Sequence, residues 1–287
     1  MKIAVLSGKG GTGKTLVSVN LASVAVHSTY VDCDVEEPNG ALFFKPIDLE
    51  EERVSVKIPV VDHDRCNGCR ECVEFCKFNA LAFINKKVKV FETICHSCGG
   101  CTLVCPEKAI HETEKVIGHI EEGKSQDVRV ITGILNTGEE TGVPIIKKLL
   151  ERISFEKMTT VIDCPPGSSC MVMESIKDAD YCVLVAEPTV FGAHNLEMVY
   201  ELVTLFKKPF GCVLNKGLDG SNPSELFCED NNIPIIGRIP FDHQLGAINS
   251  NGEIVTRIDD HYRTLFETML EQIQEVARDE TIADIKR

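Results

Sequence analysis

Residues 8–15 read Gly8-Lys9-Gly10-Gly11-Thr12-Gly13-Lys14-Thr15. The stretch fits the pattern G-x-x-x-x-G-K-[ST], in which glycines let backbone N–H groups curl around a phosphate. An apolar run of strand length, 2–7, precedes it, and 16–26, which reads as a buried helix, follows it. A strand, this loop and a helix together predict a phosphate site at the positive end of the helix. Lys14 would reach the β- and γ-phosphates, and the Thr15 hydroxyl would bind Mg²⁺.

Outward from this loop, apolar segments alternate with helix-like ones. Further strands are predicted at 29–32, 159–163, 181–186, 210–215 and 234–239. Helices are predicted at 141–153, 169–178, 192–208, 221–232 and 259–278. This alternation is typical of an α/β fold with a mostly parallel sheet. Two other segments break it: 35–58 is interpreted as a loop and linker, and 115–120 with 127–132 as a β-hairpin that turns at 121–124.

The cysteine content is the second decisive feature. Of 14 cysteines, eight lie between positions 66 and 105. A reducing compartment disfavours disulfides, so dense cysteine indicates metal. Residues 66–76 follow C-x₂-C-x₂-C-x₃-C, and 95–105 repeat the pattern 29 positions later. Zinc usually takes paired C-x₂-C ligands, which would leave the third cysteine of each repeat without a use.

The repeated spacing is that of bacterial two-cluster ferredoxins, in which the fourth cysteine of each run ligates the other cluster. It therefore implies two [4Fe–4S] clusters. The first is expected on Cys66, Cys69, Cys72 and Cys105, and the second on Cys95, Cys98, Cys101 and Cys76. We assign 59–112 to an inserted α+β ferredoxin-like domain, and 1–58 with 113–287 to the α/β domain that it interrupts.

Charge and composition exclude several other classes. The 287 residues include 44 acidic and 30 basic ones, for a formal net charge of −14, and there is no tryptophan. A free-standing nucleic-acid binder usually carries a basic excess, and a polybasic membrane binder does so by definition. No apolar run reaches the ~18 residues of a membrane-spanning helix, and the phosphate loop begins too early to leave room for a signal peptide. We expect a cytoplasmic protein without nucleic-acid binding or membrane insertion.

The phosphate loop, with its early lysine, resembles the deviant Walker A loop of the MinD/Mrp/ParA and nitrogenase-iron-protein ATPases. Further segments resemble that group in the expected order: 32–39 its switch I, 163–167 its Walker B and switch II, 214–216 its base-reading segment, and 239–242 the loop against the adenine. The resemblance implies a P-loop sheet of the MinD type that binds ATP or ADP with Mg²⁺ and hydrolyses ATP.

The resemblance also implies individual roles. Gly8, Lys9, Gly10, Gly11, Thr12, Gly13, Lys14 and Thr15 would hold the phosphates, and Thr15, Asp34 and Asp163 the Mg²⁺. Asp34 would position the attacking water. Asn215 would read the base, with Pro240 and Phe241 against the adenine. Lys9 would act across a dimer on the partner's phosphates, so hydrolysis would need a homodimer or a heterodimer with a related ATPase.

Cys170 lies seven residues after Asp163, at the spacing of a cluster-binding cysteine in the nitrogenase iron protein. The resemblance implies that Cys170 and its symmetry mate could touch a third metal site at a dimer interface. The iron protein uses two such cysteines per subunit, and this chain has no clear second one.

As a whole, the chain resembles MinD-superfamily ATPases that contain an inserted ferredoxin domain. Three functions follow: ATP-gated electron transfer through the clusters, iron–sulfur cluster assembly or carriage like that of Mrp-type proteins, and spatial positioning like that of MinD and ParA. The two-cluster insert favours the first, and the ATPase half with Cys170 favours the second. The first two require a redox partner or a cluster-acceptor protein. The insert joins soon after switch I, so we expect nucleotide state to move the clusters or to change which protein docks on them.

Overall fold

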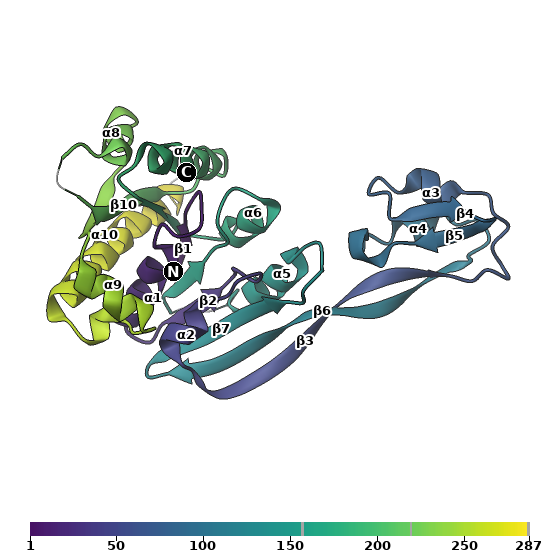
Figure 1. The fold of residues 1–287 in the computed structure, drawn as a ribbon, viewed down its shortest axis with the longest axis horizontal. Coiled ribbons are helices and arrows are strands. Elements are labelled where there is room, and N and C mark those ends of the chain that lie inside the picture. Colours follow the sequence, from purple (N-terminus) through teal and green to yellow (C-terminus); the bar gives the residue numbers. More distant parts are fainter. Residues whose placement is uncertain (156–157, 219, 286–287) are drawn as a thin grey trace.

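The computed structural model describes residues 1–155, 158–218 and 220–285 (Figure 1). Within them, one nine-stranded sheet has the order β11-β10-β9-β1-β8-β2-β7-β6-β3. Its parallel strands are β1 (Lys2–Leu6), β2 (Thr29–Asp32), β7 (Val128–Leu135), β8 (Thr160–Asp163), β9 (Tyr181–Ala186), β10 (Phe210–Gly217) and β11 (Ile235–Pro240). The predicted α/β fold with a mostly parallel sheet is confirmed.

Helices cover both faces of the parallel strands. One face packs against α1 (Lys14–Val24), α9 (His243–Ser250) and α10 (Asp260–Ile285). The other packs against α5 (Val143–Arg152), α6 (Cys170–Ile176), α7 (Val190–Leu205) and α8 (Pro223–Asp230). In β1, Ile3 and Val5 belong to the first core, and Ala4 and Leu6 to the second. A strand buried on both faces reads as a continuous apolar run, which is why these strands were visible in the sequence.

The prediction of a loop and linker at 35–58 is wrong for the second half of that segment. It contains α2 (Gly40–Phe44) and most of β3 (Ile47–Val61), a strand at the edge of the sheet. β3 pairs antiparallel with β6 (Ile110–Ser125) along almost its whole length. Residues 47–53 of β3 are exposed and mostly acidic, so the strand lacks the apolar alternation by which strands are recognised. Its partner lies about 60 positions downstream, where no local pattern reveals it.

The predicted hairpin is confirmed, but its turn lies further along the chain than predicted. β6 pairs antiparallel with β7, and the pairing reaches Ser125 opposite Val128. Residues 121–124, predicted as the turn, are therefore part of β6. The chain reverses at 126–127, where Gln126 adopts a left-handed φ of 55°.

The β3–β6 ribbon continues beyond the sheet and carries a small unit at its far end (Figure 1). This unit, residues 62–109, contains α3 (Glu71–Phe75), β4 (Leu81–Ile84), β5 (Lys87–Val90) and α4 (Gly100–Val104), and we call it the cysteine unit. It has a core of its own around Cys72, Leu81, Val88 and Cys101. The predicted domain boundaries, at 58/59 and 112/113, fall inside the two strands of the ribbon.

No helix in the described part of the chain is long and apolar enough to cross a membrane.

Replacement of Phe266 by alanine should destabilise the α/β domain strongly. Phe266 is fully buried between α10 and the sheet, so truncation would cost about 3–5 kcal/mol of unfolding free energy. Chemical denaturation measures this loss. Glu267→Ala, on the exposed side of the same helix, is the matched control and should change stability by less than about 0.5 kcal/mol. Equal losses in the two variants would contradict the packing of α10.

Candidate functional site

The predicted phosphate loop joins β1 to α1 at the carboxyl edge of the sheet. Gly11 and Gly13 have φ values of 79° and 97°, a region that residues with side chains rarely adopt. A Cβ on Gly13 would also lie 2.0 Å from Nδ2 of Asn215. Gly8 packs against the Asn195 carbonyl, which a Cβ would approach to 2.1 Å. Gly13 is therefore required by both conformation and space, Gly11 by conformation and Gly8 by space.

A cleft of about 590 Å³ opens beside this loop. Its lining includes the predicted site residues Gly10, Gly11, Gly13, Lys14, Thr15, Asp34, Asn215, Pro240 and Phe241. The fold thus brings the loop, the first switch segment and two distant strand ends to one place. Thr12, within the loop, is buried, and its hydroxyl oxygen has no hydrogen-bond partner among the described residues.

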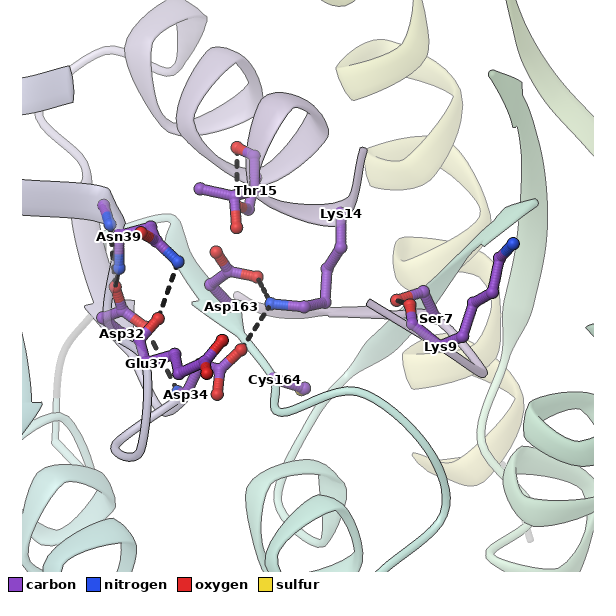
Figure 2. A network of polar contacts seen from close by, with 12 residues as sticks. Ser7, Lys9, Lys14, Thr15, Asp32, Asp34, Glu37, Asn39, Asp163 and Cys164 are labelled. Atoms are coloured by element: carbon purple, nitrogen blue, oxygen red, sulfur yellow. Dashed lines mark hydrogen bonds and ion pairs between the residues drawn. The ribbon is translucent and has the colours of Figure 1, made fainter. Parts of the chain in front are cut away.

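Lys14 lies among carboxylates. Its Nζ is 2.5 Å from Oδ1 of Asp163 and 3.6 Å from Oδ2 of Asp34 (Figure 2). Burial opposes the charge of Lys14, but Asp163 and Asp32 outweigh it and raise the pKa of this lysine. Burial, with Asp163 close by, raises the pKa of Asp34 to about 6. The site therefore concentrates negative charge that a cation must balance.

Asp32 anchors the segment that follows β2. This buried carboxylate accepts hydrogen bonds from the backbone N–H groups of Asp34 (3.1 Å), Asn39 (3.1 Å) and Gly40 (2.9 Å). Burial, followed by repulsion from Asp163, raises its pKa to about 7. Asp32 was seen in the sequence only as part of the switch motif. Its position at the last residue of a buried strand was the available signal of its importance.

Lys9 turns away from Lys14 (Figure 2). Its ammonium group forms an ion pair with Glu187 and lies 5.0 Å from the ring centroid of Phe191. Lys216 reaches the same carboxylate at 3.5 Å and donates a 2.7 Å hydrogen bond to the Gly11 carbonyl. Sequence analysis did not select Glu187 or Lys216 as site residues, although both lie at the carboxyl edge of the sheet.

Asn215, on β10, forms hydrogen bonds with the phosphate loop and with its own neighbour in the strand. Its Nδ2 donates to the Thr12 carbonyl at 2.7 Å, and its Oδ1 accepts from the Lys216 N–H at 2.9 Å. In this structure the amide that is predicted to read a base supports the phosphate loop, and Asn215 also lines the cleft.

The oxygen donors of the cleft suit Mg²⁺. Thr15 and Asp34 line it, and Asp163 lies beside them with one oxygen bonded to Lys14. Hydroxyl and carboxylate oxygens are the hard ligands that Mg²⁺ prefers. The residues present therefore fit this ion.

The eight cysteines of the cysteine unit separate into two groups. Cys66, Cys69, Cys72 and Cys105 line one pocket. Cys76, Cys95, Cys98 and Cys101 line another, of about 250 Å³. Each pocket therefore contains three cysteines from one repeat and the fourth from the other, in the two sets expected from the spacing.

The two repeats also share backbone conformation and burial. Left-handed φ values occur at Gly68 and Ser97, at Arg70 and Gly99, and at Asn79 and Lys108, each pair separated by 29 positions. In both repeats the second cysteine is exposed and the third is buried. Burial raises the pKa of the Cys72 thiol, and that of Cys101 to about 11.

The remaining metal prediction concerns Cys170, which is the exposed first residue of α6.

Across the described residues, no group of three or more histidine, cysteine, aspartate or glutamate side chains is arranged to hold a single metal ion.

Comparison with known proteins gives a family. The CobQ/CobB/MinD/ParA nucleotide binding domain matches residues 3–255. Two uncharacterized proteins of Methanocaldococcus jannaschii are similar over nearly their whole length. MJ0578 is 29% identical over 283 residues (95% of this chain and 98% of that protein), and MJ0579 is 28% identical over 265 residues (91% and 93%).

Solved structures share the fold. The cell division ATPase MinD of Pyrococcus furiosus superimposes with a TM-score of 0.61 at 19% identity, over 96% of this chain and 98% of that one. The septum site-determining protein MinD of Pyrococcus horikoshii, solved with Mg-ADP, gives 0.59 at 17% identity, over 96% of each chain.

Replacement of Gly13 by alanine should disrupt the phosphate loop even without a ligand. The left-handed conformation alone costs a side chain about 1–2 kcal/mol, and the clash with Asn215 adds to it. Thermal unfolding measures the effect. Gly10→Ala is the matched control, because a Cβ there meets nothing within 4 Å. A Gly13→Ala variant as stable as Gly10→Ala would contradict this conformation of the loop.

Proposed function

Because this chain belongs to the CobQ/CobB/MinD/ParA nucleotide-binding family, we propose that it is a Mg²⁺-dependent ATPase whose nucleotide state controls electron transfer through two [4Fe–4S] clusters. The observation that carries the proposal is the grouping of eight cysteines into two pockets, each with the four cysteines that one cluster needs. These pockets occur in the same chain as a phosphate loop whose lysine lies among carboxylates.

At the nucleotide cleft, Lys14 is the residue that must move. In the proposed reaction its ammonium leaves Asp163 for the β- and γ-phosphates, as the P-loop lysine does in this class. Thr15, Asp34 and Asp163 would hold Mg²⁺, which when bound neutralises charge on the phosphates. Asp34, at the edge of the cleft, would orient the attacking water. Lys9 would leave Glu187 to reach the phosphates of a partner subunit.

In the cysteine unit, each pocket fits the donor set of one cluster. A cubane has four iron corners and accepts ligands that are further apart than those of a single ion, so the lack of a compact single-ion site is compatible with it. The Ala109 N–H already lies 3.3 Å from Sγ of Cys105, as a donor to a cluster thiolate would. The raised thiol pKa of Cys72 would fall on binding, because metal coordination deprotonates a thiol.

A packed route leads from the nucleotide cleft towards the cysteine unit. Val35 follows Asp34 and is buried, and its carbonyl accepts a 2.8 Å hydrogen bond from Leu135 at the end of β7. The loop after β7, residues 136–142, returns to Val35 at its end. A Cβ on Gly142 would lie 2.2 Å from Cγ2 of Val35. Any displacement of Val35 therefore has to displace this loop.

The other side of the 136–142 loop faces the cysteine unit. Glu139, Glu140 and Thr141 line a small cavity together with 95–97, the loop that carries Cys95. Glu139 is fixed there by a 2.8 Å ion pair with Lys115 of the ribbon. We expect a switch movement at Asp34 to displace the 136–142 loop and so change the cavity that it shares with the loop of Cys95.

A second candidate function is the carriage or assembly of clusters. The exposed position of Cys170, on the segment that follows Asp163, favours it. In that case Cys170 and its symmetry mate would hold a transferable cluster in a dimer, in addition to the two resident ones. Iron analysis separates the two functions, because only the second predicts iron beyond that of the cysteine unit.

The two lysines of the phosphate loop should fail in different ways. Lys14→Ala should weaken ATP binding by about 10- to 100-fold, the loss of a charge-assisted hydrogen bond. Lys9→Ala should keep binding and lose turnover by about 10³-fold, the scale of a cation supplied in trans. Titration calorimetry and phosphate release measure the two quantities. Unchanged turnover in Lys9→Ala would reject the trans role and leave ATP binding in place.

Cluster content should follow the two cysteine sets. Anaerobically purified protein should contain about eight iron atoms per chain, and Cys95→Ser should retain about four. Cys182→Ala, buried in β9 outside both pockets, is the matched control and should retain all of them. Wild-type protein with zinc, or with no iron, would refute the cluster proposal.

Electron paramagnetic resonance of the reduced protein then tests the coupling. Addition of Mg-ATP should shift the cluster spectrum or potential in wild type. Gly142→Ala, which overfills the contact with Val35, should reduce that shift. Intact clusters without any response to Mg-ATP would contradict gated electron transfer.

A further inference from the structure

Tyr30 is a buried hydroxyl beside the proposed catalytic carboxylates. It lies on β2, two residues before Asp32, so both side chains point to the same face of the strand. The side chain is fully buried in the core beneath α1. Its hydroxyl donates a 2.9 Å hydrogen bond to Oδ2 of Asp163. Nothing in the local sequence pattern distinguished this residue from its apolar neighbours.

The contacts of Asp163 are divided between its two oxygens. Oδ1 accepts from Lys14 at 2.5 Å, and Oδ2 accepts from Tyr30. Figure 2 shows the carboxylate of Asp163 between Thr15 and Lys14. Oδ2 therefore keeps a fixed partner while Oδ1 faces the group that has to leave.

The ring of Tyr30 contacts the end of the switch segment. A Cβ on Gly40 would lie 2.2 Å from Cε1 of Tyr30, so only glycine allows this approach. The Gly40 N–H bonds to Asp32, and the Phe44 ring packs on Tyr30 with centroids 4.9 Å apart. One side chain therefore touches both the carboxylate of β8 and the segment anchored by Asp32.

We propose that Tyr30 is a positioning residue of the ATPase site. Its hydroxyl holds Oδ2 of Asp163, so that Oδ1 is presented to the cleft once Lys14 has moved to the phosphates. Because its ring packs against Gly40, a movement of Gly40 at the end of the switch segment would change the orientation of Asp163. The inference rests on the proposed ATPase function and deepens it, because it assigns the orientation of Asp163 to a residue outside the recognised motifs.

Tyr30→Phe tests the hydroxyl without removing the ring. Turnover of ATP should fall by about tenfold or more, because small misplacements of a positioning group cost one to two orders of magnitude. The Mg²⁺ concentration for half-maximal turnover should rise several-fold. The affinity for ADP without Mg²⁺ should stay at the wild-type value. A merely structural role would instead lower the active fraction and leave the Mg²⁺ requirement unchanged.

A measurement without turnover gives the same test. Mn²⁺ replaces Mg²⁺ as the probe, and its binding in the presence of ADP is followed by electron paramagnetic resonance. Tyr30→Phe should weaken Mn²⁺ binding several-fold. Tyr181→Phe, which removes a buried hydroxyl from β9 of the same sheet, is the matched control and should bind Mn²⁺ as wild type does.

The outcomes separate this inference from the function on which it rests. If Tyr30→Phe has the Mg²⁺ dependence and the Mn²⁺ affinity of the wild type, the role of Tyr30 is overturned and the proposed ATPase function is unaffected. A wild-type protein that binds no nucleotide would overturn both. If Tyr30→Phe does not fold, Gly40→Ala displaces the ring instead. It should shift the Mg²⁺ requirement in the same direction, and an unshifted requirement would reject the proposal.

Discussion

The charge balance around Lys14 is the constraint on which the nucleotide site depends. Asp32, Asp34 and Asp163 meet at the carboxyl edge of adjacent strands, two of them almost fully buried. Carboxylates this close repel one another, and burial adds a desolvation cost. Lys14 supplies the compensating charge, while backbone N–H groups satisfy Asp32 and a phenol satisfies Asp163. Any ligand that draws Lys14 away must bring or recruit positive charge, which is how phosphate and Mg²⁺ would bind together.

This arrangement makes the switch segment responsive. Three backbone N–H groups of residues 34–40 donate to one carboxylate, Asp32, and residues 34–39 lie outside the helices and strands. A change in the charges around that carboxylate therefore acts on the whole segment. In the proposed coupling, Val35 would pass the change towards the cysteine unit, and Gly40 would pass it to Tyr30. Two contacts that only small residues permit, at Gly40 and Gly142, thus lie on either side of the proposed switch.

The β3–β6 ribbon sets the relation between the two halves of the molecule. Its two strands belong to the edge of the main sheet at one end and carry the cysteine unit at the other (Figure 1). Charged residues on the exposed part of β3 keep this long edge strand soluble and discourage pairing with other chains. The cysteine unit is therefore not a freely tethered module, since its attachment is continuous with the sheet that holds the nucleotide cleft.

The sequence by itself determined the parallel α/β core, the phosphate loop and the two sets of four cysteines. These features are local: buried parallel strands are continuous apolar runs, glycine spacing sets a loop, and a duplicated spacing sets a pair of pockets. Only the tertiary structure decided the β3–β6 pairing, the ion pair of Lys9 with Glu187 and the bonded amide of Asn215. It also decided the place of Tyr30 against Asp163. Each of these joins residues far apart in the chain, and hydrogen bonds between distant residues depend on strand order and register, which no local pattern of residues encodes.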